Sequence, residues 1–162
     1  EDHSSCDYKK LDKSNLIVEK GIRIIKKNIV FEDNYWKISA SHDGYQKKFN
    51  TIHEREIEFY PEQMKFIGYD RLAMKDTSKN IKFDIRFHLS PNTKVMKTQD
   101  NKSILIELDD EGWKFNCENF DINIDNGLYL GIKNSYKENQ NICISGINKE
   151  ENQTIKWEIS KI

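Results

Sequence analysis

Short runs of alternating apolar and polar residues fill the chain almost from end to end. The clearest run covers residues 82–89, where Phe83, Ile85, Phe87 and Leu89 alternate with charged or polar residues. Side chains of a β-strand point to opposite faces in turn, so this run predicts a strand with one buried face. The same alternation recurs along most of the sequence. It predicts an all-β protein with little or no helix.

Twelve short strands are expected, each bounded by residues that favour turns. Their predicted ranges are 22–31, 34–42, 50–60, 63–70, 81–89, 93–98, 102–109, 112–117, 120–124, 127–132, 141–146 and 153–160. The links between them, such as Asp43-Gly44 and Asp125-Asn126-Gly127, are too short to hold crossover helices. The strands are therefore expected to pair antiparallel in two stacked sheets, as in a β-sandwich.

A chain of 162 residues is long enough for one such domain. Residues 1–15 are polar and lack periodicity, so we expect a loop or a frayed edge there and a single β-sandwich domain over 16–162. The chain begins with Glu1 rather than Met. This favours a processed chain or an excised fragment.

The charge pattern excludes two classes of partner. The chain has 26 basic and 27 acidic residues, interleaved along the sequence, and a net charge of -1. Because no basic patch stands out, nucleic acid is not expected as a partner. No apolar stretch approaches the roughly 18 residues that span a bilayer, and no signal-like segment opens the chain, so a membrane is not expected either.

The three cysteines, Cys6, Cys117 and Cys143, match no spacing typical of a zinc site. Cys117 and Cys143 lie among alternating apolar residues, where a thiol behaves as a small hydrophobic group. We expect free buried thiols, with a Cys117–Cys143 bridge as the alternative.

A more specific signal comes from three stretches taken together: ASHDGY at 40–45, HEREI at 53–57 and RFHLSPN at 86–92. In this order and spacing they resemble the heparinase II/III-like family of polysaccharide lyases. The agreement continues at 68–72, 112–115, 128–130 and 144–146. Residues 2–6 are similar to the segment that follows the family's conserved His-Asn/Ser-Thr stretch. The resemblance implies that this chain is the C-terminal β-sandwich part of such a protein.

The resemblance also implies where the chemistry of the intact protein lies. Family members carry a catalytic Tyr and an Asn or His on an N-terminal α/α toroid, and a further His in a His-x-His-x-Asp-type motif whose region also holds a zinc ion. All of these elements are expected upstream of Glu1, so no catalytic or metal-binding residue is assigned here. The intact protein is expected to cleave uronate-containing glycans by β-elimination. The expected partners are the toroid and an acidic polysaccharide, and the expected location is the periplasm or outside the cell.

Five polar residues are candidates for substrate binding, each with a structural alternative: His42, His53, Arg55, Arg86 and His88. His42 adjoins a turn, so it is expected either to anchor that hairpin by bonding a loop carbonyl or to contact substrate. His53 opens the next strand on the same face. Arg55 is expected to form a bidentate pair with Asp43 or Asp70, or to bind a uronate carboxylate.

Arg86 and His88 lie on the polar face of the strand predicted at 81–89, where long side chains usually cover the sheet and keep their polar ends in water. A metal cluster of His42, His53 and His88 is a further alternative, although their spacing gives no local chelate. A nominal ligand set of His3, Cys6 and Asp7 lies in the polar N-terminal segment.

The three tryptophans, Trp36, Trp113 and Trp157, occupy the same alternate positions as their apolar neighbours. They are therefore expected in the core rather than stacked on sugar rings. Two other functions stay open at this point. One is an independent module that binds acidic glycans. The other is a structural interaction domain with an apolar docking patch that self-associates.

Overall fold

The computed structural model describes residues 5–10, 16–78, 80–132 and 135–162. These residues form thirteen strands, one short α-helix and one turn of 3₁₀-helix, which confirms the all-β prediction. The elements are β1 (Asp7–Lys10), β2 (Leu16–Lys20), β3 (Ile24–Glu32), β4 (Tyr35–His42), α1 (Gln46–Phe49), β5 (Thr51–Tyr60), η1 (Pro61–Gln63), β6 (Lys65–Met74), β7 (Ile81–His88), β8 (Lys94–Lys97), β9 (Ser103–Leu108), β10 (Glu111–Asn116), β11 (Asp121–Ile132), β12 (Ser135–Asn148) and β13 (Asn152–Lys161).

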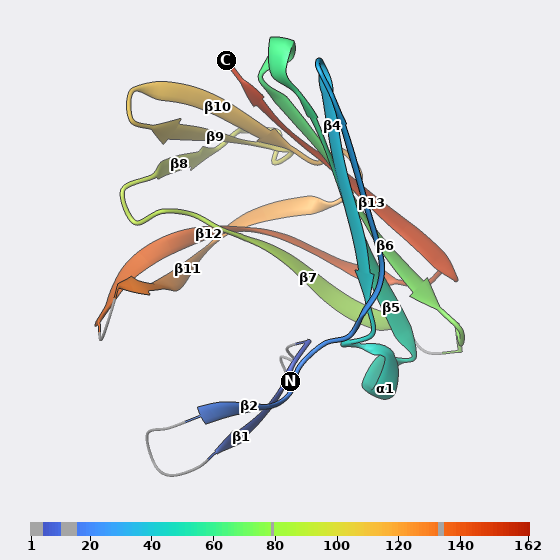
Figure 1. Cartoon of the computed structure of the whole chain (residues 1–162). Helices are drawn as coiled ribbons and strands as arrows, with labels where there is room; N and C mark the ends of the chain where they lie inside the picture. The colour runs from blue at the N-terminus through green and yellow to red at the C-terminus, as the bar shows by residue number, and fades with distance from the viewer. Residues whose placement is uncertain (1–4, 11–15, 79, 133–134) are drawn as a thin grey trace.

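The strands form two main sheets and a separate two-stranded ribbon of β1 and β2. The larger sheet has eight strands in the order β3-β4-β5-β6-β13-β10-β9-β8, and the smaller has three in the order β11-β12-β7. All neighbours pair antiparallel. In Figure 1 the eight-stranded sheet curves from β3 and β4 round to β8, and the three-stranded sheet lies across its concave side. The prediction of two stacked antiparallel sheets is therefore confirmed.

The core lies between the inner faces of the two sheets. The eight-stranded sheet contributes Ile104, Phe115 and Ile155, and the three-stranded sheet contributes Ile122, Ile142 and Ile144, all essentially without solvent exposure. These residues occupy alternate positions on their strands, as the two-residue periodicity requires. Burial of such side chains stabilises the fold by about 1.5–3 kcal/mol each.

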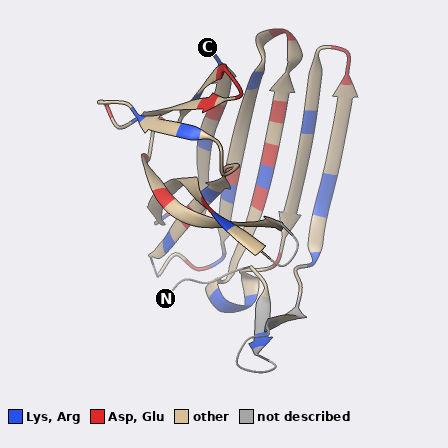
Figure 2. Cartoon of the chain, turned by 90° about the vertical axis from the view of Figure 1, so that its left-hand side faces the viewer, with Lys and Arg blue, Asp and Glu red and all other residues tan. Residues whose placement is uncertain are grey.

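The outer face of the eight-stranded sheet is polar. Ion pairs link neighbouring strands there, with nitrogen–oxygen distances of 3.2 Å for Lys37–Glu56, 2.6 Å for Arg71–Glu54 and 2.8 Å for Lys65–Glu158. Figure 2 shows both signs of charge distributed over this sheet. The contrast between the two faces sets the register of each strand, because a slip by one residue would bring the charges inside.

Three sequence-based predictions about the elements were wrong. The loop expected over 1–15 contains strand β1 (Asp7–Lys10), which pairs with β2, although residues 1–4 and 11–15 lie outside the described parts. The strands expected at 120–124 and 127–132 are one continuous strand, β11. The strand expected at 141–146 is the middle of β12, which is fourteen residues long. Pairing between β11 and β12 extends both strands through residues that favour turns.

Two of the three tryptophans lie in or against the core, and the third is exposed. Trp157 is only 4% exposed and belongs to the core, and Trp113 packs against it, but Trp36 is 41% exposed. Trp36 lies on β4, beyond the area that the three-stranded sheet covers.

Cys117 and Cys143 are free and buried, as expected, and burial raises the pKa of both thiols.

Among the described residues, no helix has the length and apolar character needed to cross a membrane.

Candidate functional site

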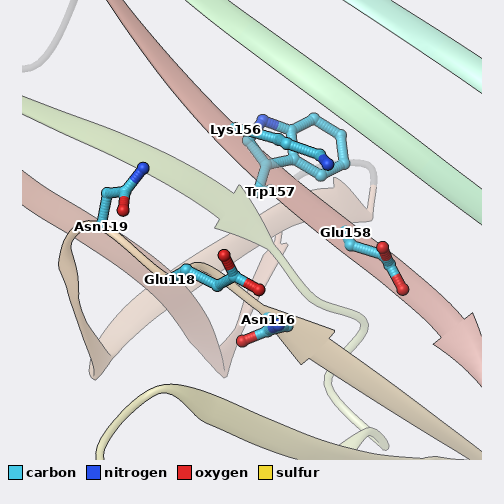
Figure 3. Close-up of a pocket in the computed structure, with 6 residues that line it drawn as sticks. All are labelled: Asn116, Glu118, Asn119, Lys156, Trp157 and Glu158. Atoms are coloured by element: carbon cyan, nitrogen blue, oxygen red, sulfur yellow. The ribbon is translucent and has the colours of Figure 1, made fainter.

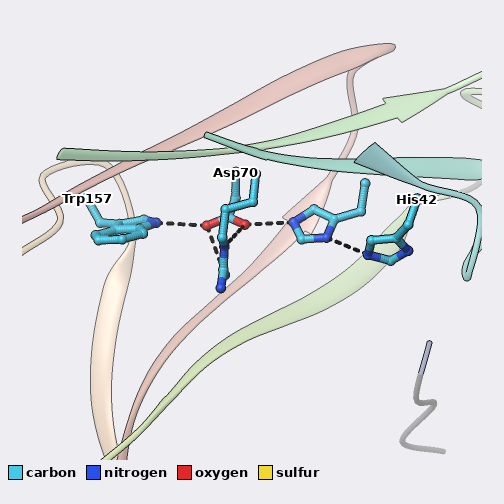
Figure 4. A network of polar contacts seen from close by, with 5 residues as sticks. His42, Asp70 and Trp157 are labelled. Carbon is cyan, nitrogen blue, oxygen red and sulfur yellow. Dashed lines mark hydrogen bonds and ion pairs between the residues drawn. The ribbon is translucent and has the colours of Figure 1, made fainter. Parts of the chain in front are cut away.

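A buried carboxylate, Asp70 on β6, is the centre of the most extensive polar network between the sheets. Asp70 has no exposed area and accepts hydrogen bonds from three side chains. His53 Nε2 lies 2.7 Å from Oδ1, Arg55 donates from Nε to Oδ1 at 2.7 Å and from a terminal nitrogen to Oδ2 at 3.1 Å, and Trp157 Nε1 donates to Oδ2 at 2.8 Å. His42 extends the network through His53 (Figure 4).

Strand register brings these side chains together on the inner face of the eight-stranded sheet. His42 is paired with His53 between β4 and β5, and Arg55 is paired with Asp70 between β5 and β6. Trp157 on β13 is paired with Gly68 on β6, where any side chain would overlap the indole ring. Glycine at this position therefore lets the indole lie flat across the sheet and reach the carboxylate two residues along β6.

The direction of every hydrogen bond along the two imidazoles follows from the carboxylate. An ionised Asp70 only accepts, so His53 donates from Nε2, and its Nδ1 accepts from His42 Nε2 at 3.0 Å. His42 Nδ1 then accepts from the backbone N–H of Gly44 at 3.2 Å. All four ring nitrogens of the two histidines are thus engaged, and both rings are held as the neutral Nε2–H tautomer.

At Asp70, hydrogen bonding lowers the pKa of the carboxyl by more than burial raises it. Burial by itself would raise the pKa of the Asp70 carboxyl, but the hydrogen bonds from His53, Arg55 and Trp157 and the charge of Arg55 together lower the pKa below its ordinary value of 3.8. The carboxylate therefore stays ionised and is neutralised by Arg55, which is the arrangement that a buried charge requires.

Arg55 also connects the two sheets. Its guanidinium carbon lies 5.4 Å from the ring centroid of Phe87 on β7 and 6.0 Å from that of Trp157, both within the range of a cation–π contact. The side chain is 35% exposed. Of the two partners predicted for Arg55, Asp70 is right and Asp43 is wrong, since Asp43 instead binds Arg23 with an Nε–Oδ2 distance of 3.1 Å.

The network predicts that acid destabilises the fold in two stages. Burial and the neighbouring His53 lower the pKa of His42 below 6.5, with Arg55 adding to the shift and Asp43 opposing it. The unfolded chain then takes up a proton at His42 before the folded chain does, so stability is lost as pH falls from 6.5 toward the folded-state pKa. The pKa of Asp70 is also lowered, so its contribution is lost at pH values below 3.8.

Urea unfolding followed at several pH values below 7 measures the first stage. The slope for one site is at most about 1.4 kcal/mol per pH unit. Substituting His42→Gln should remove this slope, whereas His88→Gln, which alters an exposed imidazole, should leave it unchanged. A wild-type stability that does not vary between pH 6.5 and the acid transition would contradict the neutral His42.

Arg86 and His88 do not join this network. They lie on the outward face of β7, where Arg86 donates to Asp84 and to Asp125 at 3.0 Å each, and His88 is exposed. The sequence-based prediction that Arg86 covers a polar sheet face is confirmed.

His42 does anchor its hairpin. It accepts a hydrogen bond from the Gly44 amide rather than donating to a loop carbonyl, because its Nε2–H is donated to His53.

The three histidines that the structure describes do not fit a zinc site. His42 and His53 have no ring nitrogen left for a metal, and His88 lies on the opposite face of another sheet. Within the parts of the chain that the structure describes, no three His, Cys, Asp or Glu residues are grouped to hold a metal ion. His3 lies outside those parts, and so does the side chain of Asp7.

One small polar pocket opens where β10 ends beside β13. It is lined by Asn116, Glu118, Asn119, Lys156, Trp157 and Glu158 (Figure 3). Its volume of about 50 Å³ is far below the roughly 300–1,000 Å³ of typical ligand sites. The pocket is suited to a few water molecules rather than to a sugar ring.

Sequence analysis placed three network members, His42, His53 and Arg55, among its candidates, and missed the roles of the other two. Trp157 was expected only as a core residue, and Asp70 only as one possible partner of Arg55. The available signal was strand parity, because Asp70 lies in phase with inward-facing Phe66, Gly68 and Leu72. A carboxylate at an inward position requires donors from neighbouring strands.

Comparison with known proteins agrees with this fold. The family model for "Heparinase II/III-like, C-terminal" matches residues 1–158. The heparan sulfate lyase HepC from Pedobacter heparinus is similar in structure, with a TM-score of 0.71 at 12% identity over 90% of this chain and 22% of that one. Two heparinase III structures give TM-scores of 0.65 and 0.64 at 13% and 14% identity, over 88% and 90% of this chain and 22% of each of theirs.

No curated protein matches the sequence. The chain spans about 22% of the length of the solved structures that it resembles, so it corresponds to one domain of larger proteins. The match of the family model over almost the whole chain agrees with the two-sheet architecture and with the motifs at 40–45, 53–57 and 86–92. The chain belongs to the heparinase II/III-like C-terminal domain family.

Proposed function

We propose that this chain is the scaffold domain of a polysaccharide lyase that cleaves uronate-containing glycans by β-elimination, and that the rest of the enzyme supplies the acid and the base. The observation that carries the proposal is the closed hydrogen bonding of the Asp70 network. Its two imidazoles and its carboxylate are engaged with one another, with Trp157 and with a backbone amide.

β-Elimination requires three groups at one site. A cation or hydrogen-bond donor neutralises the uronate carboxylate, a base removes the adjacent proton, and an acid protonates the leaving oxygen. His42 and His53 offer neither a free lone pair nor an exchangeable proton that is not already shared. Arg55 directs two of its nitrogens to Asp70, so most of its charge is balanced inside the domain.

The similar structures are a heparan sulfate lyase and two heparinases III, and this chain spans 22% of the length of each, which supports a larger enzyme as the functional unit. We propose the N-terminal α/α toroid implied by the sequence resemblance as the partner domain, and an acidic polysaccharide as the substrate. The substrate-binding roles of His42, His53, Arg55, Arg86 and His88 stay predictions. Zinc in the intact enzyme is likewise a prediction, with ligands from outside this chain.

Incubation of the chain with heparin, heparan sulfate and an unsulfated uronate polysaccharide tests the proposal. We expect no rise in the ultraviolet absorbance of unsaturated uronate products from this chain, and a steady rise from a longer polypeptide that includes the upstream region. Product formation by this chain alone would refute the scaffold role. Saturable binding of a polysaccharide to this chain, measured by calorimetry, would instead favour the glycan-binding module.

A further inference from the structure

Both ends of the two-stranded ribbon contact the same turn of the chain. Within the described residues β1 and β2 pair only with each other, and in Figure 1 the ribbon extends away from both sheets, beside α1. The chain enters the ribbon after Ser5 and leaves it before Ile22 and Arg23. All three residues lie against the turn at 43–45, which joins β4 to α1. The attachment of the ribbon therefore depends on this turn.

The two ends of the ribbon are held by different kinds of contact. At the end that leads into β3, Asp43 accepts from the backbone N–H of Arg23 at 2.9 Å and from its Nε at 3.1 Å. At the other end, Ser5 lies so close to Gly44 that a methyl group there would come within 2.6 Å of the Ser5 main-chain oxygen. The Tyr45 hydroxyl is also hydrogen-bonded to Ser5. One end is thus held by an ion pair and the other by neutral contacts.

The imidazole of His42 holds the turn where Ser5 meets it. Gly44 donates its backbone N–H to His42 Nδ1 at 3.2 Å, and His42 Nε2 is bonded to His53 Nδ1 at 3.0 Å. The ring also lies beside that of Tyr45, with centroids 5.6 Å apart. A proton added to Nδ1 would place two N–H donors opposite each other. Because the bond to His53 keeps the ring in position, the Gly44 amide would have to move, and Ser5 lies directly against it.

We infer that the turn at 43–45 is an acid-sensitive switch for the ribbon: uptake of a proton by His42 displaces Gly44 and releases Ser5, while Arg23 stays paired with Asp43. At neutral pH the ribbon is fixed at both ends. In acid it is fixed only at Arg23 and moves relative to the sheets. This inference does not depend on the proposed lyase role, because every contact that carries it lies within this chain.

The surroundings of His42 place the switch in mildly acidic solution. Charged and titratable groups lie around it on β5, in the turn and in the N-terminal segment: His53 and Arg55, Asp43 and Tyr45, and Cys6 beside Tyr45. Burial, then His53 and Arg55, lower the pKa of His42 below 6.5, and Asp43 opposes them. Burial raises the pKa of Tyr45, so its hydroxyl keeps its proton.

Release is therefore linked to proton uptake. In the released turn His42 is open to water and its pKa returns toward 6.5, so the released state binds a proton that the closed state excludes. For one proton, the released fraction rises by at most about tenfold for each pH unit below 6.5.

Amide hydrogen exchange and proton NMR on this chain, between about pH 7.5 and pH 5, test the inference. The protection factor of the Gly44 amide, taken against an unstructured chain at the same pH, should fall by up to about tenfold per pH unit below 6.5. Nuclear Overhauser effects between Ser5 and the Tyr45 ring should weaken in parallel. The amide of Ile142, in the central strand β12, should stay protected. Constant protection at Gly44, or loss in step with Ile142, would overturn the inference.

His42→Gln separates the titration from the hydrogen bonds. A glutamine amide can donate to His53 and accept from Gly44 but does not titrate in this range, so Gly44 protection should no longer depend on pH. The control His88→Gln removes an exposed imidazole and should keep the wild-type dependence. An unchanged pH dependence in His42→Gln would contradict the switch.

Tyr45→Phe tests the contact with Ser5 independently, because it removes one hydroxyl and leaves His42 in place. We expect the Overhauser effects from Ser5 to the ring at position 45 to be weak already at neutral pH, while Gly44 protection keeps its pH dependence. The control Tyr35→Phe removes a hydroxyl that donates to Glu58 and should change neither signal. Wild-type Overhauser effects in Tyr45→Phe would show that this turn does not hold Ser5.

Discussion

Asp70→Asn is expected to destabilise the domain by about 3–5 kcal/mol, since it leaves the Arg55 charge in a partly buried site without its counter-ion. The amide also presents a donor where three donors converge. Because small domains are stable by only about 5–15 kcal/mol, a loss of this size removes a large share of the folding free energy. Urea unfolding followed by circular dichroism measures it.

Asp125→Asn is the matched control, because it makes the same chemical change in an ion pair with Arg86 at the surface. The Asp125 side chain is 39% exposed, and exposed pairs contribute about 1 kcal/mol or less. A loss at Asp70 no larger than the loss at Asp125 would mean that the buried carboxylate does not organise the inner face.

Gly68→Ala should have the second largest effect, with a loss of about 3 kcal/mol. A methyl group at position 68 would occupy the space of the Trp157 ring, so the indole must move out of the core. That movement breaks the hydrogen bond from Trp157 to Asp70 and the contact of the indole with Phe87, whose ring centroid lies 4.8 Å away. Unfolding free energy and the emission wavelength of tryptophan fluorescence report the two consequences.

Gly21→Ala is the control, since nothing lies within 4 Å of a methyl group at that position. It should be neutral or slightly stabilising, because alanine restricts the unfolded chain. A Gly68→Ala protein with unchanged stability and emission would show that the indole does not lie across β6 as described.

Local periodicity was sufficient to predict most of the strands and the two-sheet class of the fold. Strand β7, with its unbroken alternation from Ile81 to His88, was predicted to within one residue. The break between the strands predicted at 102–109 and 112–117 is also present, and Asp109 and Asp110 form the turn there. Both residues of that turn have positive φ, as a tight hairpin of this kind requires. β11 was predicted as two strands because Asp125-Asn126-Gly127 carries a strong turn signal. Glycine is needed at position 127 for packing instead, because a side chain there would overlap the side chains of Asn139 and Asn141 on β12.

The candidate site was only partly predictable, because its assembly depends on strand order. His42, His53 and Arg55 share a face with apolar neighbours, and this parity was visible in the sequence. Their common partner depends on which strand lies next to β5, and strand order is a long-range property that alternation does not encode. The exposure of Trp36 is another such case, since its parity is that of a core residue but the opposite sheet is too narrow to cover it.

A closed polar network in the core agrees with the scaffold role proposed for this chain. Hydrogen bonds from four strands and one cation–π contact fix β4, β5, β6 and β13 relative to β7. In the proposed enzyme, a rigid wall of this kind would hold the neighbouring part in place without taking part in proton transfer.

Nitrogen-15 NMR of the imidazole rings of this chain, recorded with and without heparan sulfate, tests the closed network most directly. We expect His42 and His53 both as the neutral Nε2–H tautomer at neutral pH, with ring shifts that the polysaccharide does not change, and His42 still neutral when pH falls to 6.5. A protonated His42 at that pH, a ring in the Nδ1–H tautomer, or a change of protonation on adding the polysaccharide would contradict the network and with it the scaffold role.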